Sequence, residues 1–370
     1  MVVRKTGARK QQVGQLLIIG FDGTALTPRL RDLLRHVQPS GVILFARNIV
    51  DADQTHRLLK DCRNAVKHPI FTCVDMEGGT VDRLRAVFGP TPSAADVFAT
   101  GNPRLFRKHG ELIGHACHMT GFNLDLAPVV DLALSSSRKV MTSRSVSADP
   151  DQVSAYARHF LTGLGAKHVF GAIKHFPGLG AATLDTHHDL PRVSRSSQRL
   201  WDEDLLPYRK LRRYTPFVLV GHASYPEITQ HAVPASLSVH WITQVLRKQI
   251  GYDGVVISDD LEMGAILKTM SIGQATVRHI RAGGDLCLVC HQEQHVLAAF
   301  EALRRAADDP TSAPRIAESL RRIRALRKQS RAFFQHPIAP TATKVRTFSR
   351  QLWEFAEEVR LKSISRQAEA

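Results

Sequence analysis

The stretch GVVISDD, residues 254–260, joins an unbroken apolar run to a pair of aspartates. An apolar run without alternation is typical of a strand that is buried on both faces of a parallel sheet. Similar runs recur along the chain, each followed by turn-forming or polar residues. There are eight in all: QLLIIG (15–20), GVILFA (41–46), FTCVD (71–75), FNLDLAP (122–128), FGAIKH (170–175), FVLVGH (217–222), GVVISDD (254–260) and DLCLVC (285–290).

Amphipathic segments with helical periodicity separate these runs. Clear examples are TPRLRDLLRHV (27–37), ADQTHRLLKDCRNAV (52–66), DQVSAYARHFLTGLGA (151–166), HWITQVLRKQI (240–250) and EQHVLAAFEALRRAA (293–307). Strand and helix in eightfold alternation is the order of a (β/α)8 barrel. A doubly wound open sheet would alternate too, but the chain lacks the glycine fingerprint of a dinucleotide site. We therefore predict an α/β protein with a single TIM barrel over residues 1–332.

The end of the chain has a different pattern. PIAPTATK (337–344) has the composition of a linker, and QLWEFAEEVRLKSI (351–364) has the periodicity of one amphipathic helix. Residues 333–370 are therefore predicted to form a linker and a short helical tail that packs back on the barrel or binds a partner. The sequence pattern does not indicate whether the protein is a monomer or an oligomer.

Charge and composition limit the possible partners. The 370 residues are 43% hydrophobic and carry a net charge of +16. Residues 301–370 contain 15 Lys or Arg against eight Asp or Glu, and residues 1–10 add four basic residues and no acidic one. Most of the excess charge thus lies at the two ends, which is typical of solvated surface. Only 6% of residues are aromatic and no basic stripe interleaves with them, so we predict no specific nucleic-acid partner.

Cysteines and apolar runs indicate the compartment. The five cysteines have no disulfide-scaffold spacing, which favours a reducing environment. Cys287 and Cys290 form a CxxC pair, but positions i and i+3 of a strand point to opposite faces, so no metal is expected there. No apolar stretch approaches 18 residues and no signal-peptide core follows the N-terminus. We expect a cytoplasmic protein without a membrane span.

Polar groups follow most of the predicted strands. They are Asp75, Glu77, Asp125, Lys174, His175, His222, Asp259 and Asp260. Singly, such a histidine is often a satisfied core group and such an aspartate often caps a helix. In a barrel, however, the carboxyl ends of all strands meet at one mouth, where the chemistry of this fold is found. Convergence at five of eight strand ends therefore predicts an active site; the eighth strand departs from the pattern and ends in Cys290 and His291.

The loop after the fifth strand, within KHFPGLGAATLDTHHDLP (174–191), adds further titratable groups. Asp185 lies two residues before His187, and a carboxylate that reaches an imidazole fixes its tautomer and raises the basicity of the other nitrogen. This pair is suited to proton transfer. A zinc site from His175, His187 and His188 is the alternative, but it lacks the helical HExxH spacing, and we predict no metal.

Several sequence blocks, taken together, resemble glycoside hydrolase family 3, in particular its β-N-acetylglucosaminidase branch. The blocks are VDMEGGTVDRL, GFNLDLAPVVDL, SRSVSADP, KHFPGLG followed by DTH, PASLS and GYDGVVISDDLEM, in this order within residues 12–330. The resemblance implies a retaining hydrolase that removes terminal N-acetylglucosamine from muropeptides or similar amino-sugar fragments, with a role in peptidoglycan recycling. It implies a small carbohydrate substrate and no cofactor.

The resemblance also assigns roles to residues. Asp259 would be the nucleophile that forms a covalent glycosyl-enzyme, and His187 would be the acid and base, oriented by Asp185. The substrate-binding residues would be Asp75, Arg83, Arg144, Lys174, His175 and His222. The usual second carboxyl group of a retaining enzyme is replaced here by an imidazole, whose ordinary pKa already lies near neutral pH.

The chain departs from the branch at three blocks. DQEGGR reads DMEGGT, IGDRSF reads MTSRSV, and KHFPGHG reads KHFPGLG, so Met76, Thr80 and Leu179 replace more polar residues. These departures leave the precise sugar and its aglycone open. Three alternatives to the implied function remain: a β-glycosidase for another sugar, a phosphorolytic variant, and a sugar-binding barrel without catalysis. The presence of Asp185, His187 and Asp259 together argues against the last of these.

Overall fold

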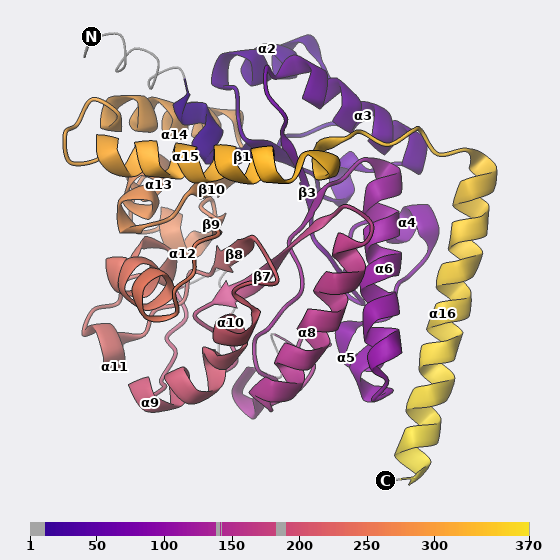
Figure 1. Cartoon of the computed structure of the whole chain (residues 1–370). Helices are drawn as coiled ribbons and strands as arrows, with labels where there is room; N and C mark the ends of the chain where they lie inside the picture. Colours follow the sequence, from indigo (N-terminus) through magenta and orange to yellow (C-terminus); the bar gives the residue numbers. More distant parts are fainter. Residues whose placement is uncertain (1–11, 138–140, 142, 183–189, 370) are drawn as a thin grey trace.

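Eight parallel strands pair side by side and close into a barrel in the computed structural model, which describes residues 12–137, 141, 143–182 and 190–369 (Figure 1). Around the barrel the order is β1, β10, β9, β8, β7, β6, β3 and β2. Closure is made by β1, in which Ile18 is in register with Leu288 of β10 and with Gly41 of β2. The predicted (β/α)8 barrel is thus confirmed.

The strands coincide with the eight predicted apolar runs. They are β1 (Leu17–Ile19), β2 (Gly41–Ile43), β3 (Phe71–Val74), β6 (Leu124–Asp125), β7 (Phe170–Phe176), β8 (Phe217–Val220), β9 (Val255–Asp260) and β10 (Leu286–Val289). Every residue of these strands is buried except the last two of β9, Asp259 and Asp260, which are partly exposed where the strand reaches the mouth. A short antiparallel hairpin, β4 (Met76–Gly78) and β5 (Val81–Asp82), follows β3 at the same end.

Helices surround the barrel. The longer ones are α2 (Pro28–Val37), α3 (Ala52–Ala65), α6 (Pro103–Thr120), α8 (Pro150–Gly165), α13 (Ile272–Ala282), α14 (Glu293–Ala306), α15 (Ala313–Gln329), α16 (Ala342–Glu369) and the π-helix η6 (His240–Gln249). The shorter ones are α4 (Arg85–Phe88), α5 (Ala94–Ala99), α9 (Ser197–Arg199), α10 (Leu206–Leu211), α11 (Pro226–Thr229), α12 (Gly264–Leu267), η1 (Val13–Leu16), η2 (Ala46–Asn48), η3 (Ser135–Ser137), η4 (Leu200–Asp204), η5 (Ala235–Leu237) and η7 (Arg331–Phe334). Side-chain caps start several of them: Asp149 accepts from the backbone N–H of Asp151 before Pro150, the predicted start of α8.

The N-terminal end of the barrel is filled by aromatic rings. Phe71, Phe170 and Phe217 begin three strands there and pack edge to face. Phe333 from η7 stacks on Phe170 with ring centroids 4.2 Å apart, and Phe334 contacts Phe71 at 5.2 Å. The segment after α15 therefore packs against the N-terminal end of the barrel.

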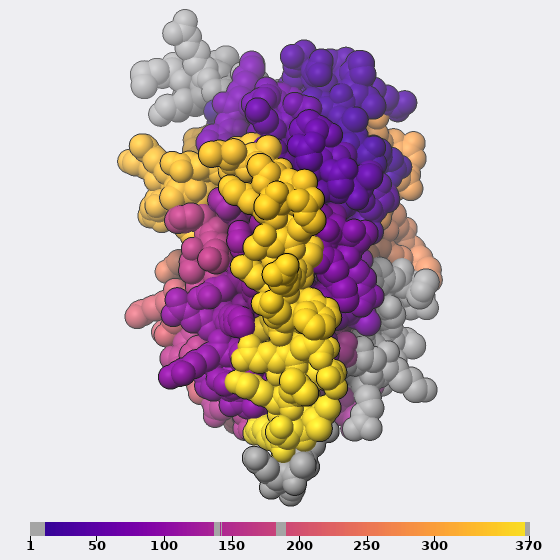
Figure 2. Space-filling model, turned by 90° about the vertical axis from the view of Figure 1, so that its right-hand side faces the viewer, coloured from indigo at the N-terminus to yellow at the C-terminus, as the bar shows by residue number. Residues whose placement is uncertain are grey.

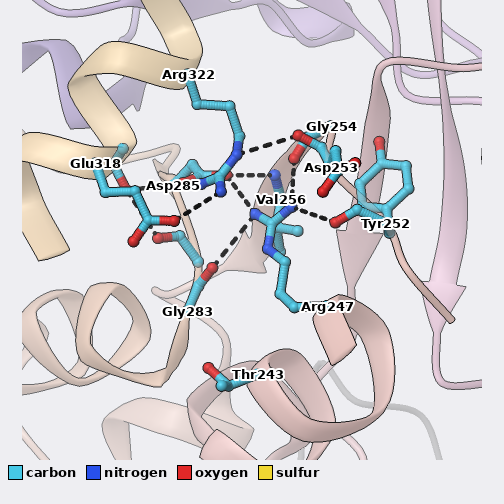
Figure 3. Close-up of polar contacts among 12 residues, drawn as sticks. Thr243, Arg247, Tyr252, Asp253, Gly254, Val256, Gly283, Asp285, Glu318 and Arg322 are labelled. Atoms are coloured by element: carbon cyan, nitrogen blue, oxygen red, sulfur yellow. Dashed lines mark hydrogen bonds and ion pairs between the residues drawn. The ribbon is translucent and has the colours of Figure 1, made fainter. Parts of the chain in front are cut away.

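The same N-terminal end holds a buried ion-pair cluster around Asp285 (Figure 3). One carboxylate oxygen accepts from Arg247 at 2.6 Å and from the Val256 backbone at 3.0 Å. The other accepts from Arg315 at 2.6 Å and Arg322 at 2.7 Å. Burial alone would raise the pKa of Asp285, but the three guanidinium groups lower it below its ordinary value. The cluster fastens β9, β10 and α15 together.

We expect Asp285→Asn to lower the free energy of unfolding by about 3–5 kcal/mol, because three buried guanidinium groups lose their shared counter-charge. Urea titration followed by circular dichroism measures this loss. The KM for substrate should not change, since the cluster lies at the end of the barrel away from the mouth. Asp253→Asn, at an exposed side chain beside the cluster, is the control and should leave the midpoint unaltered. Equal midpoints for Asp285→Asn and the wild type would contradict the expectation.

The tail packs back against the barrel as one helix, α16, which is longer than the predicted stretch 351–364 (Figure 1). Its inner side buries Phe348, Leu352, Phe355 and Val359. Phe348 packs edge to face on Phe88 of α4 with ring centroids 5.0 Å apart. The helix starts nine residues before the predicted stretch because this ring contact lies upstream of it.

Candidate active site

A cavity of about 400 Å³ opens at the C-terminal ends of the strands. Its lining comes from residues on or just after β2, β3, β5, β6, β7, β8, β9 and β10: Ile43, Phe45, Asp75, Arg83, Leu126, Lys174, His175, Leu219, Asp259, Asp260, Glu262, Met263, Gly264, Leu288, Cys290 and His291. Five of the predicted site residues thus line one hollow, namely Asp75, Arg83, Lys174, His175 and Asp259.

Lys174 is the centre of the polar wall of this cavity. Its ammonium group lies 2.8 Å from Asp75 and 2.6 Å from Glu77. Glu77 also accepts two bonds from Arg144, at 2.7 and 2.8 Å. The side chains of Lys174 and Glu77 are only 4% and 3% exposed. Burial opposes both charges, yet the pKa of Lys174 is raised by Asp75 and Glu77, and that of Glu77 is lowered by Lys174 and Arg144, so Lys174 and Glu77 are both ionised at neutral pH.

His175 is held in one orientation by Asp131. Its Nδ1 lies 2.7 Å from the Asp131 carboxylate, which also accepts from the backbone N–H of Leu179 at 2.7 Å. The contact makes Nδ1 the donor, so Nε2 is left as the acceptor, 3.5 Å from Arg144. Asp131 was not among the predicted site residues, although it stands in the block GFNLDLAPVVDL that supported the resemblance.

Asp259 ends β9 on the floor of the cavity. One of its carboxylate oxygens accepts from the backbone N–H of Asp260 at 2.9 Å. Burial alone would raise the pKa of Asp259, but this N–H and the Lys174 ammonium help to lower it below its ordinary value. Asp259 is therefore an ionised carboxylate that is poorly hydrated, the state that a nucleophile requires.

His222 lies beneath the cavity rather than on its surface. It is fully buried, with Nδ1 2.7 Å from the Ser236 hydroxyl and Nε2 2.8 Å from the Asp260 carbonyl. Burial lowers the pKa of His222, so the ring is neutral and Nε2 donates to the carbonyl. Of the predicted substrate-binding residues, this one contacts the backbone that carries Asp259 and Asp260.

The opposite wall is aromatic. The His291 ring stacks on Phe45 with centroids 5.5 Å apart, and its Nε2 lies 3.1 Å from Asp260. This hydrogen bond raises the pKa of His291. Arg83 lies 6.0 Å from the Phe45 ring centroid, and its Nε is buried without a partner among the described residues. The sequence pointed to His291 through its place at the end of the eighth predicted strand. Nothing in the sequence pointed to Phe45 as a site residue.

The predicted acid and base residues, Asp185 and His187, lie outside the described residues, as does His188. Within residues 12–137, 141, 143–182 and 190–369, no three His, Cys, Asp or Glu side chains are grouped as metal ligands. The five cysteines are free and buried. No helix in the same ranges is both long and apolar enough to cross a bilayer.

The fold and the site together define a class of enzyme. An ionised carboxylate faces a cavity whose polar wall presents the Lys174 ammonium, which is bonded to the Asp75 carboxylate, and the His175 imidazole, which is bonded to Asp131. Groups of these kinds are suited to bonding the hydroxyls of a sugar ring. This is the arrangement of a glycoside hydrolase built on a (β/α)8 barrel.

Comparison with known proteins gives the family. Residues 9–326 match the "Glycosyl hydrolase family 3 N terminal domain". A β-hexosaminidase of Xanthomonas campestris pv. campestris (strain B100) is 35% identical over 285 residues, which span 75% of this chain and 85% of that protein. The chain belongs to glycoside hydrolase family 3.

Solved structures agree with this assignment. A family 3 β-N-acetylglucosaminidase from Paenibacillus sp. superposes with a TM-score of 0.87 and 30% identity, over 94% of this chain and 68% of that one. A β-N-acetylhexosaminidase from Beutenbergia cavernae superposes with a TM-score of 0.79 and 27% identity, over 86% of this chain and 98% of that one.

Proposed function

We propose that the protein is a retaining exo-β-N-acetylglucosaminidase that hydrolyses terminal β-linked N-acetylglucosamine. The observation that carries the proposal is the ionised Asp259 in a cavity whose polar wall is built around Lys174. The β-hexosaminidase and β-N-acetylglucosaminidase relatives support the choice of sugar. A cavity of about 400 Å³ is at the small end of the range for ligand pockets, which suits one terminal residue better than a long chain.

The mechanism proposed is a double displacement. An Asp259 oxygen attacks the anomeric carbon, the bond from that carbon to the leaving oxygen breaks, and His187 gives a proton to that oxygen. In the second half His187 takes a proton from water, the water oxygen bonds to the anomeric carbon, and Asp259 leaves as a carboxylate. Asp185 would orient His187 and stabilise its charged form.

The polar wall would hold the sugar in place. Lys174 and His175 Nε2 would bond its hydroxyls, with Asp75 as an acceptor and Arg83 at the aromatic side. Arg144 acts by fixing Glu77 and by contacting Nε2 of His175. Because Asp75, Lys174 and His175 are already held by hydrogen bonds to protein groups before substrate arrives, little reorganisation is needed on binding. We propose muropeptide-type amino-sugar fragments as the substrates, and recycling of peptidoglycan in the cytoplasm as the setting.

The test compares the release of nitrophenol from the β-linked N-acetylglucosaminide, glucoside and xyloside. The N-acetylglucosaminide should be cleaved at least about tenfold faster than the other two, a margin that a few polar contacts to the acetamido group supply. Equal rates on the three sugars would reject the assigned specificity. Tight binding of a sugar fragment without turnover of any would reject hydrolysis and support a binding protein instead, and turnover that depends on inorganic phosphate would identify a phosphorylase.

We expect His187→Ala to slow hydrolysis by roughly 10²–10⁴-fold, the usual contribution of general acid and base catalysis. The loss should be greatest for an alkyl glycoside, whose leaving oxygen needs the proton, and smaller for a dinitrophenyl glycoside, which leaves as a stable anion. The pH profile should also lose the limb that the imidazole causes. His188→Ala is the matched control and should retain activity. If both variants lost equal activity on every leaving group, the acid and base role would have to move to another residue.

A further inference from the structure

The outer face of α16 has no partner among the described residues. The helix lies as a ridge along one side of the molecule, with its outer side turned to the viewer in Figure 2. While the inner side buries Phe348, Leu352, Phe355 and Val359, the outer side exposes three large apolar residues. Trp353 is 65%, Leu361 56% and Ile364 53% exposed. Exposed apolar side chains in one row mark a contact surface more often than isolated ones do.

The outer residues follow the spacing of a coiled coil. Positions 353, 357, 360 and 364 are separated by four, three and four residues, which is the a/d spacing of a heptad. They hold Trp353, Glu357, Arg360 and Ile364. The two apolar residues thus flank a central pair of opposite charge, and Glu357 and Arg360 already form an ion pair with each other at 2.8 Å.

This row is complementary to itself when reversed. In an antiparallel pair of identical helices related by a two-fold axis between residues 358 and 359, position 353 faces 364 of the other copy and position 357 faces 360. Trp353 would then pack on Ile364 and Glu357 would meet Arg360, twice each by symmetry. We propose that the outer face of α16 is a homodimer interface in which a second copy of this chain packs antiparallel across the row defined by Trp353, Glu357, Arg360 and Ile364.

The charges favour a second copy over other partners. A lipid surface would require an apolar stripe without acidic residues, whereas Glu354 and Glu357 interrupt this one. A strongly acidic or strongly basic partner would meet both a positive and a negative side chain, Arg360 and Glu357, at the centre of the row, and one of them would repel it. The segment from Trp353 to Ile364 spans 12 residues, about 18 Å of helix, so the contact is small and the dimer should dissociate in the micromolar range.

The test is the mass of the full chain by sedimentation velocity between about 1 and 100 μM. We expect a concentration-dependent dimer, and Trp353→Ala should weaken the association at least tenfold. Glu357→Arg and Arg360→Glu should each abolish it, because each places like charges across the axis. An equimolar mixture of these two variants should associate again, since one chain then carries two basic side chains at positions 357 and 360 and the other carries two acidic ones.

Thermal unfolding checks that the variants are folded, and since all these side chains are partly or fully exposed, their melting temperatures should match the wild type. A wild-type chain that stays monomeric at 100 μM would overturn the proposal. So would a mixture of the two charge variants that fails to associate, or a dimer that Trp353→Ala leaves intact. None of these outcomes depends on which sugar the active site accepts.

Discussion

Asp259→Ala is expected to lower kcat/KM for a nitrophenyl N-acetylglucosaminide by at least about 10⁴-fold, because the carboxylate that would attack the anomeric carbon is gone. The free energy of unfolding should change little. The side chain donates no hydrogen bond, and the favourable contacts of its carboxylate are largely offset by the cost of burying the charge. This loss in kcat/KM reports on the nucleophile alone only if the cavity keeps its shape. Unchanged affinity for a non-hydrolysable N-acetylglucosamine analogue verifies that it does.

Azide distinguishes a nucleophile from a merely electrostatic carboxylate. In Asp259→Ala the space of the carboxyl group is open, and azide can attack the anomeric carbon from that side as the nitrophenolate leaves. The product would be a glycosyl azide of inverted configuration, detectable by nuclear magnetic resonance. Asp260→Asn is the matched control, because asparagine keeps the oxygen that accepts from the Glu262 backbone at 3.0 Å. Loss of equal size in the control, or no azide adduct, would assign the nucleophile elsewhere.

Lys174→Met is expected to lower the free energy of unfolding by about 3–5 kcal/mol at pH 7, the usual result of removing one member of a buried ion pair. Methionine fills much of the same space, so the loss arises from Asp75 and Glu77, which are left without their ammonium. Activity should fall as well, since the hydroxyl donor is lost. Lys210→Met, at a half-exposed pair with Asp151, is the control and should cost no more than about 1 kcal/mol.

The difference between wild type and Lys174→Met should depend on pH. The pKa of Glu77 in the folded protein lies below its ordinary value of 4.5, so the stability that it contributes is present above pH 4.5 and is lost as the pH falls below it. Urea titrations at pH 7 and pH 3.5 should therefore show a smaller difference at the lower pH. A difference that is constant with pH would indicate lost packing rather than lost charge.

Local sequence determined most of the fold. Each of the eight apolar runs forms a strand of the barrel. A strand that is apolar on both faces must bury both of them, one against the surrounding helices and the other in the barrel interior. Helix starts such as Asp149 with Pro150 were also local signals. The tail helix is longer than predicted, and its first turns are held by the contact of Phe348 with Phe88, which is not a property of neighbouring residues.

The site was predictable in part. Polar residues at the strand ends were recognised because parallel strands of a barrel end at one mouth, and Asp75, Lys174, His175 and Asp259 do line one cavity. The sequence alone did not indicate which of them are ionised. That depends on distances such as the 2.6 Å between Lys174 and Glu77, which exist only once the fold brings the Lys174 side chain of β7 to Glu77 in the β4–β5 hairpin.

Only the tertiary structure decided the remaining contacts. Phe45 follows β2 and His291 follows β10, about 250 residues apart in the chain, and closure of the barrel through β1 stacks them on one another. Asp131 reaches His175 from the strand end beside it, and His222 turns beneath the cavity because both of its ring nitrogens find partners there. Patterns of hydrophobicity specify which residues are buried and in what local form, whereas pairing across the barrel is set by strand register, which no single segment contains.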